Sequence, residues 1–253
     1  RRVIRDFFGS NVFFIPDFQR DYKWVEDKSA KIIKEEHDVE EDEGDEFRQF
    51  LADLRASCES THDTEYYIGT VISHEEKKNE LQLIDGQQRV TSIVLILASY
   101  IMWLKETNAN DDHIAEYRGI IKKFYDGKKD TKILSTSDPY GEKFLTKLFQ
   151  KFEMPEFKKE IEIENTKNHR DTVEQCLAFF RVKRPKGYNL DFVKYILDHV
   201  VVAHVDATNF RQAFVVFERM NDRGRDLTVP DKIKYFLMKH YSYDAKVFLE
   251  NSD

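Results

Sequence analysis

The sequence contains few of the residues that build disulfide-stabilised, metal-binding or strongly basic proteins. Its 253 residues include two cysteines, Cys58 and Cys176, which give neither a disulfide framework nor metal-ligand spacing. The formal net charge is -7, so any contact with DNA must come from a local basic patch. We therefore expect two plain thiols and a location in the reducing cytoplasm.

Other absences narrow the class of protein further. No apolar run reaches the ~20 residues that a membrane-spanning helix needs, and no apolar segment of a secretory signal follows the charged N-terminus. The sequence has neither a Walker A lysine motif nor a C-terminal His-Asn-His arrangement. With 41% hydrophobic and 34% charged residues, the composition is that of a soluble globular chain. Because the chain begins at Arg1, we expect a fragment of a longer protein.

The most tightly specified stretch is ELQLIDGQQRVTSIVLILASYIMWL, residues 80–104. Its alternation through Leu81 and Leu83 predicts a short strand. From Val90 onward, apolar residues recur at helical spacing until the predicted helix is apolar nearly all round, which is typical of a helix inside the protein. Asp85 is a suitable N-cap for this helix, and with the glutamine three places on it fits an Asp variant of the capping box.

A strand that turns directly into a buried helix is a natural site for phosphate, because the helix begins with unpaired N–H groups and the positive end of its dipole. Gly86 would let a ligand approach the backbone. Gln87 and Gln88 offer amide donors and acceptors, and Arg89 has a planar guanidinium suited to phosphate oxygens. A capped helix start with a solvated arginine explains the same residues, and spacing alone favours neither interpretation.

An earlier stretch, NVFFIPDFQRDYKW at residues 11–24, predicts a strand that a proline ends. If the following residues are extended, Arg20, Tyr22 and Trp24 share one face and Gln19 points elsewhere. Aromatic rings beside an arginine suit a base and a phosphate. The edge of a core strand explains them too, and on general grounds that structural interpretation is favoured.

The remaining periodicity predicts three further regions of regular structure. YYIGTVIS at 66–73 is a strand that forms a hairpin, through a longer loop, with the strand before Asp85. HVVVAHVD at 199–206 is a buried strand, in which His204 is a hydrogen-bonded core histidine and not a metal ligand. The chain between these strands is mainly helical, and another helix follows the last strand; helices are predicted over 111–125, 138–152, 172–180, 189–197 and 211–220.

Basic residues interleave with aromatic residues in the helical middle of the chain. For most of them we favour amphipathic helices whose lysines face water. The best candidate for a DNA contact is a loop that carries four cations, Arg181, Lys183, Arg184 and Lys186. The acidic run at 40–46 is interpreted as a solvated loop and not as a metal site, so the residues of any metal site stay unknown.

A third stretch, FVVFERMNDRGRDLTVPDKIKYFL at 214–237, ends one predicted helix and begins another. Asn221 and Gly224 suit a helix end, and Thr228 with Pro230 suits the start of the next helix. This structural role is sufficient to explain Gly224. Arg223 and Asn221 have no such structural need.

Together these three stretches resemble the GmrSD-type family, the N-terminal ParB/sulfiredoxin-like domain of modification-dependent restriction and phage-defence proteins. LQLIDGQQRVTSI resembles its main signature. IPDFQRDYKW resembles the second signature, in which the Gln-Arg pair lies at the nucleotide site. The stretch from Phe217 resembles the third, F-x-x-x-N-x-x-G-x-x-L, in which the Asn and the following loop line the same pocket.

The resemblance implies a domain that binds and hydrolyses a nucleoside triphosphate, with Mg²⁺, and couples hydrolysis to recognition of modified DNA. Cleavage would be carried out by a separate C-terminal HNH-type nuclease domain or partner subunit. We expect Arg89 and Arg20 to hold the phosphates, a glutamine of the turn to orient water, and Asp85 either to bind Mg²⁺ or to cap the helix. The expected catalytic residues are Asp85, Gln88, Arg89 and Arg20. The expected nucleotide-binding residues are Gln19, Tyr22, Trp24, Gly86, Gln87, Thr91, Asn221, Arg223 and Gly224.

The expected fold class is α+β, with a small mixed sheet of ParB/sulfiredoxin-like type packed on the buried helix. Residues 1–105 and 199–253 would form this core, and residues 106–198 an inserted helical subdomain. Two alternatives stay open for the function. The chain could be a nucleotide switch that does not hydrolyse, or a ParB-like DNA-binding module.

Overall fold

The structure, a computed structural model, describes residues 1–19, 22, 46–60, 64–125, 128–151 and 165–221. A mixed six-stranded sheet with the order β1-β8-β3-β4-β2-β7 is surrounded by helices, so the predicted α+β class is confirmed. The strands of this sheet are β1 (Arg2–Val3), β2 (Val12–Ile15), β3 (Tyr66–Lys77), β4 (Glu80–Asp85), β7 (Leu134–Thr136) and β8 (Val200–Ala207). The described helices are α1 (Ile4–Phe8), α2 (Glu46–Ser60), α3 (Gln87–Glu106), α4 (Asp111–Ile121), α5 (Pro139–Lys151), α6 (Lys167–Arg181), α7 (Tyr188–Asp198) and α8 (Phe210–Asn221).

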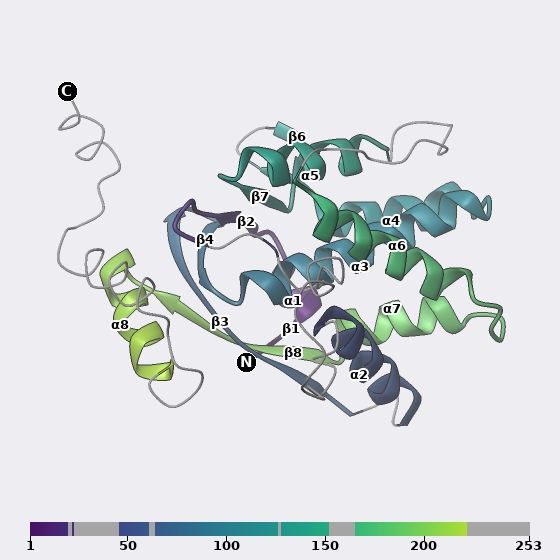
Figure 1. The fold of residues 1–253 in the computed structure, drawn as a ribbon, viewed down its shortest axis with the longest axis horizontal. Coiled ribbons are helices and arrows are strands. Elements are labelled where there is room, and N and C mark those ends of the chain that lie inside the picture. The colour runs from purple at the N-terminus through teal and green to yellow at the C-terminus, as the bar shows by residue number, and fades with distance from the viewer. Residues whose placement is uncertain (20–21, 23–45, 61–63, 126–127, 152–164, 222–253) are drawn as a thin grey trace, which may run out of the picture.

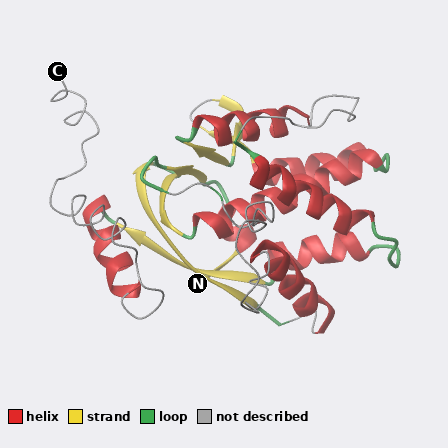
Figure 2. Ribbon diagram, viewed as in Figure 1, coloured by secondary structure: helices red, strands yellow, loops and turns green. Residues whose placement is uncertain are grey.

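The helix α3 is the centre of the hydrophobic core, as its sequence predicts. Its side chains are buried from Val90 to Met102, because the sheet lies on one side of α3 and the helices α4, α6 and α7 lie on the other (Figure 1). Helix α8 packs separately against β3, β4 and β8 through Phe214 and Phe217. Figure 2 shows most helices on one side of the sheet and α8 at the opposite end. None of the described helices combines the length and the apolar character that crossing a membrane requires.

The strands β3 and β4 form the predicted hairpin, but the predicted longer loop between them is wrong. The polar residues after Ser73 continue β3, and Lys77 pairs with Glu80 across a two-residue turn. Asn79 has a φ of 65° in this turn, a conformation that asparagine tolerates better than most residues. The strand therefore extends beyond the apolar part of its sequence.

The turn that leads into α3 differs from the predicted capping box. Gly86, with a φ of 84°, is the N-cap residue, and no side chain caps the helix. Asp85 instead ends β4. A β-carbon on Gly86 would lie 2.8 Å from Cγ2 of Val71 and 3.1 Å from the carbonyl oxygen of Thr70. Glycine is therefore needed here because the turn packs closely against β3 with positive φ.

The middle of the chain is less helical than its spacing predicts. The helix predicted over 111–125 ends at Ile121, and the chain continues as a small antiparallel hairpin of β5 (Lys122–Tyr125) and β6 (Lys128–Lys132). Strand β7 then pairs in parallel with β2 and forms one edge of the main sheet. Residues 106–198 therefore contribute a strand to the central sheet as well as helices to the core.

His204 on β8 is the hydrogen-bonded core histidine that the sequence predicts. Its Nε2 lies 2.7 Å from Oγ of Ser73 on the neighbouring strand. Burial lowers the pKa of His204 from 6.5 to about 4. The imidazole is therefore neutral at physiological pH and serves the packing between β3 and β8.

Candidate functional site

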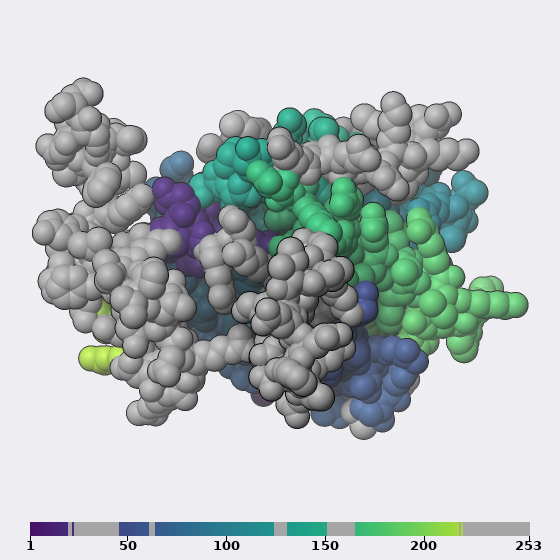
Figure 3. All heavy atoms as spheres, viewed as in Figure 1, coloured from purple at the N-terminus to yellow at the C-terminus, as the bar shows by residue number. Residues whose placement is uncertain are grey.

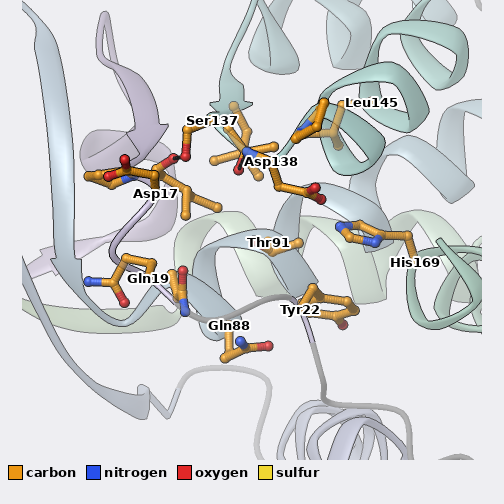
Figure 4. Close-up of a pocket in the computed structure, with 15 residues that line it drawn as sticks. Asp17, Gln19, Tyr22, Gln88, Thr91, Ser137, Asp138, Leu145 and His169 are labelled. Atoms are coloured by element: carbon orange, nitrogen blue, oxygen red, sulfur yellow. Dashed lines mark hydrogen bonds between the residues drawn. The ribbon is translucent and has the colours of Figure 1, made fainter. Parts of the chain in front are cut away.

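A cavity of about 250 Å³ lies where β2, β7 and the first turns of α3 and α5 meet (Figure 4). Apolar side chains such as Leu134 and Leu145 line part of it. Polar side chains from four separate segments line the rest: Asp17, Gln19, Tyr22, Gln87, Gln88, Thr91, Thr136, Ser137, Asp138 and His169. Five of the predicted site residues thus meet at one cavity: Gln19, Tyr22, Gln87, Gln88 and Thr91.

Two helix N-termini face this cavity. Residues Gln87, Gln88 and Thr91 of α3 fall on one side of its first turns and line the cavity, whereas no side chain caps this end of the helix. The N-terminus of α5 is capped by Asp138, whose Oδ2 accepts a hydrogen bond of 2.7 Å from the backbone N–H of Gly141. Asp138 already occupies the start of α5, so the start of α3, which no side chain caps, is where the positive end of a helix dipole can receive an anion.

Gln19 links the early motif to the turn before α3. Its Nε2 donates hydrogen bonds to the carbonyl oxygens of Ile84, at 2.7 Å, and Leu83, at 3.4 Å. Its backbone N–H donates to the carbonyl oxygen of Pro16 at 3.0 Å, so the chain turns directly after β2. This turn, rather than an extended segment, places Gln19 on the cavity wall.

Tyr22 closes the floor of the cavity and is 7% exposed. Its hydroxyl lies 2.9 Å from Oγ of Ser92 on α3 and accepts a hydrogen bond of 3.2 Å from Thr172 on α6. The backbone carbonyl of Tyr22 accepts a third hydrogen bond, of 2.9 Å, from Asn168. Tyr22 therefore connects the early motif to two helices and shapes the cavity.

His169 is a cavity residue that the sequence analysis did not select. It is 8% exposed, and its ring centroid lies 5.0 Å from that of Tyr22 and 5.3 Å from that of Phe144. Burial lowers its pKa to about 4, although Asp138 acts in the opposite direction. No described residue forms a hydrogen bond with its imidazole, and Figure 4 shows the ring turned toward Asp138 across the cavity. A neutral imidazole can offer a ligand one donor and one acceptor.

Two sequence signals could have identified these additional residues. His169 shares the apolar face of α6 with residues three, four and seven places on, and a polar residue on such a face is informative. The Ser-Asp-Pro run before α5 is a helix-start signal that marks Asp138 as a cap. Asp17, Thr136 and Ser137 carry no comparable signal, because only the pairing of β2 with β7 brings them to the cavity.

Arg89 and Asp85 do not line the cavity. The Nη1 of Arg89 donates a hydrogen bond of 2.6 Å to the carbonyl oxygen of Thr70 and lies 3.9 Å from the Asp85 carboxylate. A β-carbon on Gly69 would lie 3.1 Å from Cζ of Arg89, so this glycine makes room for the guanidinium. Both charged residues of the turn thus face β3, on another side of α3 from Gln88 and Thr91.

Several predicted residues cannot be placed. Arg20, Trp24, Arg223 and Gly224 lie outside the described residues, and Asn221 is described only by its backbone at the end of α8. The basic loop, Arg181 to Lys186, lies away from the cavity, beside the opposite end of α3. Gly86 sets the turn but is not on the cavity lining.

The described residues do not form a complete metal site by themselves. Among the residues with described positions, no three His, Cys, Asp or Glu side chains are close enough together to hold a metal. The cavity nevertheless presents the carboxylates of Asp17 and Asp138. Mg²⁺ is commonly bound by one or two carboxylates together with substrate phosphates, so this donor set fits Mg²⁺ that arrives with a nucleotide.

One protein family matches most of the chain. The family model described as the GmrSD restriction endonuclease, N-terminal domain, matches residues 4–238. That range includes all three motifs and every described wall of the cavity. No curated protein matches the chain. The chain belongs to the family of GmrSD restriction endonuclease N-terminal domains.

Proposed function

We propose that this chain binds a nucleoside triphosphate in the α3–α5 cavity and hydrolyses it, as the sensor domain of a modification-dependent restriction endonuclease. The observation that carries the proposal is the meeting of the α3 N-terminus, which no side chain caps, with Gln19, Gln88 and Thr91 at one cavity. Backbone N–H groups at helix starts bind phosphate without a Walker A lysine. A restriction and phage-defence role is consistent with the family.

The size of the cavity suggests which part of the nucleotide it holds. Typical ligand pockets measure ~300–1,000 Å³, whereas this cavity measures about 250 Å³. The phosphates and part of the sugar would fill it, with the phosphates against the first turn of α3. The base would then extend out of the described cavity.

The side chains of the cavity have distinct proposed roles. Gln88 and Gln87 orient the attacking water, and the Thr91 hydroxyl binds a phosphate oxygen. Gln19 holds the turn before α3 in place through Ile84. Asp17 would hold Mg²⁺ together with phosphate oxygens, and Asp138, whose two oxygens also cap α5, would contribute a remaining lone pair. That ion would neutralise negative charge on the phosphates.

The proposed roles of the arginines differ. The described lining of the cavity contains no Lys or Arg, so Arg20, the next residue after Gln19, is the proposed phosphate-binding cation. Arg89 acts indirectly, since it holds the turn against β3 through the Thr70 carbonyl. Asp85 supports Arg89 from 3.9 Å and is not assigned to the metal.

Phosphate release with each of the four nucleoside triphosphates and Mg²⁺ tests the proposal. We expect release with at least one nucleotide, and loss of release with EDTA or with Gln88→Ala. Binding that raises the melting temperature without phosphate release would identify a nucleotide switch instead. No effect of any nucleotide on melting, combined with salt-dependent DNA binding, would identify a DNA-binding module.

The coupling to DNA is tested separately. We expect modified DNA to change the rate of phosphate release more than unmodified DNA of the same sequence. Cleavage is proposed to need the C-terminal HNH-type nuclease domain or a partner subunit, so this chain alone should bind DNA and leave it intact. Cleavage by this chain would contradict that division of labour.

A further inference from the structure

A second and larger cavity lies at the other end of α3. It measures about 630 Å³ and is lined by the end of α3, the loop between α6 and α7, and the first turn of α7. We call it the α6–α7 groove. The α6–α7 loop stands at the end of the molecule opposite α8, where it projects from the surface (Figures 1 and 3).

The charged side chains that line this groove are all positive. Its lining includes Arg181, Lys183, Arg184 and Lys186 and no Asp or Glu. Arg181 is neutralised by Glu106, which accepts hydrogen bonds of 2.9 and 2.5 Å from its guanidinium. Lys183 and Lys186 are exposed, and neither forms an ion pair with any residue that the structure describes. The groove is thus locally basic on a chain with a net charge of -7.

Arg184 holds the loop in shape and has a different role from the lysines. Its Nη1 donates a hydrogen bond of 2.5 Å to the carbonyl oxygen of Phe179. Its guanidinium lies 4.1 Å from the ring centroid of Phe179 and 4.8 Å from that of Tyr188. Because this side chain is stacked and bonded, Lys183 and Lys186 are the cations that can reach a phosphate.

The start of α7 adds a second feature that favours phosphate. Gly187, with a φ of 91°, is the N-cap residue, and no side chain caps this helix of 11 residues. Its first turn, from Tyr188 to Leu190, lines the groove. Asp191 also stands in this first turn, but it lines the adjoining pocket with Glu59 and not the groove. The positive end of the α7 dipole faces the same space as the two lysines.

Aromatic side chains form the other wall of the groove. Trp103 and Tyr100 are stacked with ring centroids 5.8 Å apart, and His113 and Phe180 adjoin them. Aromatic surfaces next to cations are typical of sites that stack unpaired bases. An apolar groove for a protein segment would not need this excess of positive charge.

Asn189 forms part of the wall of the groove. It is 8% exposed, and its Nδ2 donates a hydrogen bond of 2.8 Å to the carbonyl oxygen of Phe180. Its Oδ1 is buried and has no hydrogen-bond partner.

We propose that the α6–α7 groove binds an unpaired DNA base together with its flanking phosphates. The base stacks on Trp103, and the phosphates contact Lys183, Lys186 and the start of α7. This inference rests on the proposed function in one respect, which is that the nucleic acid bound is DNA. The nucleotide cavity is separate, because Gln87 and Trp103 are about 24 Å apart along α3.

Fluorescence anisotropy with a labelled DNA single strand, without nucleotide, tests the phosphate contacts. Each phosphate contact with a single strand contributes about 0.7 to the slope of log K against log salt. We expect Lys183→Gln with Lys186→Gln to lower the slope by about 1.4. The matched control is Lys77→Gln with Lys78→Gln, two exposed lysines at the tip of the β3–β4 hairpin, which should leave the slope unchanged. An equal effect of both pairs, or no effect of the groove pair, would overturn the proposal.

A change in the DNA tests the base site without changing the protein. A strand with abasic residues keeps its phosphates, and we expect it to bind about tenfold more weakly than the normal strand. Perfect duplex should also bind about tenfold more weakly. The Trp103→Ala variant, whose folding is checked by its melting curve, should bind the normal strand and the abasic strand with the same affinity. If abasic and normal strands bind wild-type protein equally, the groove does not hold a base.

Phosphate release in the same protein preparations separates the two proposals. The lysine variants and Trp103→Ala should keep basal phosphate release without DNA. Intact DNA binding with no phosphate release would overturn the proposed nucleotide function and leave the groove assignment standing. Phosphate release without preference for unpaired DNA would overturn the groove assignment and leave the proposed nucleotide function standing.

Discussion

The side-chain amide of Gln19 donates a hydrogen bond of 2.7 Å to the carbonyl oxygen of Ile84, 65 positions later in the chain. This bond joins the early motif to the end of β4, one residue before the turn into α3. Since Ile84 is 1% exposed, the bond is shielded from solvent. The two motifs therefore meet directly, through a hydrogen bond from a side chain to the backbone.

Loss of this bond should weaken both the fold and the site. We expect Gln19→Leu to lower the free energy of unfolding by about 1 kcal/mol and to weaken nucleotide binding, because the turn before α3 loses its support. Urea unfolding and the nucleotide-dependent shift in melting temperature measure the two effects. Unchanged unfolding and binding would mean that Gln19 does not organise the cavity.

The two sides of α3 should respond differently to substitution. Thr91→Val should strongly reduce phosphate release with little change in melting temperature, because Thr91 lines the cavity and its hydroxyl is the proposed phosphate ligand. Arg89→Ala should lower the stability by about 1–2 kcal/mol, because it removes a charged donor from the Thr70 carbonyl. An Arg89→Ala protein that melts normally but releases no phosphate would show that Arg89 reaches the nucleotide.

Two glycine substitutions should have opposite effects on stability. Gly86→Ala should destabilise the protein by more than about 1 kcal/mol, because its φ of 84° disfavours a side chain and the new methyl group would meet Val71. Gly119→Ala is the matched control inside α4, where no atom lies within 4 Å of the new methyl group. It should stabilise the protein by about 0.5–1 kcal/mol. Equal melting temperatures for Gly86→Ala and wild type would contradict the close packing of the turn on β3.

Acid should destabilise the protein below its neutral range. His169 has a folded pKa of about 4, below its ordinary value of 6.5, so the unfolded chain binds a proton between these values and the folded chain does not. Stability therefore falls as the pH decreases from 6.5 toward 4, by up to about 1.4 kcal/mol per pH unit for this residue. His204 acts in the same direction. Urea unfolding between pH 7 and pH 5 should show a shallower decrease for His169→Gln than for wild type, with parallel curves above pH 7.

Neither cysteine should react with a thiol reagent in the native protein. Cys58 is 2% exposed and burial raises its pKa to about 11, while Cys176 is fully buried and its pKa is also raised. Since the thiolate is the reactive form, an Ellman assay should detect almost no thiol until urea is added, and then two thiols. Rapid reaction of one thiol in the folded protein would show that a helix opens locally.

Much of the fold is encoded locally in the sequence. The alternating residues of β4 and the apolar spacing of α3 predict both elements, and the β-branched run of β8 predicts a buried strand. These predictions succeed because periodicity records which face of a single element is covered. The β5–β6 hairpin also had a local signal, an Asp-Gly dipeptide at 126–127, which the helical spacing around it obscured.

The candidate site depends on contacts that no local pattern contains. The amide groups of the turn were predictable as polar residues near a helix start, whereas Gln19 was predicted only through the family resemblance. His169 and Asp138 join them only because α6 packs on α3 and β7 pairs with β2. The orientation of Arg89 follows from the room that Gly69 leaves on β3.

The sequence by itself determined the buried helix, the strand before it and the presence of a polar turn between them. Only the tertiary structure decided which side of that turn faces a cavity and which side faces the sheet. The physical reason is that a helix start presents several side chains at about 100° intervals. The neighbours that β3, α5 and α6 supply around it determine whether each one meets a ligand or the protein.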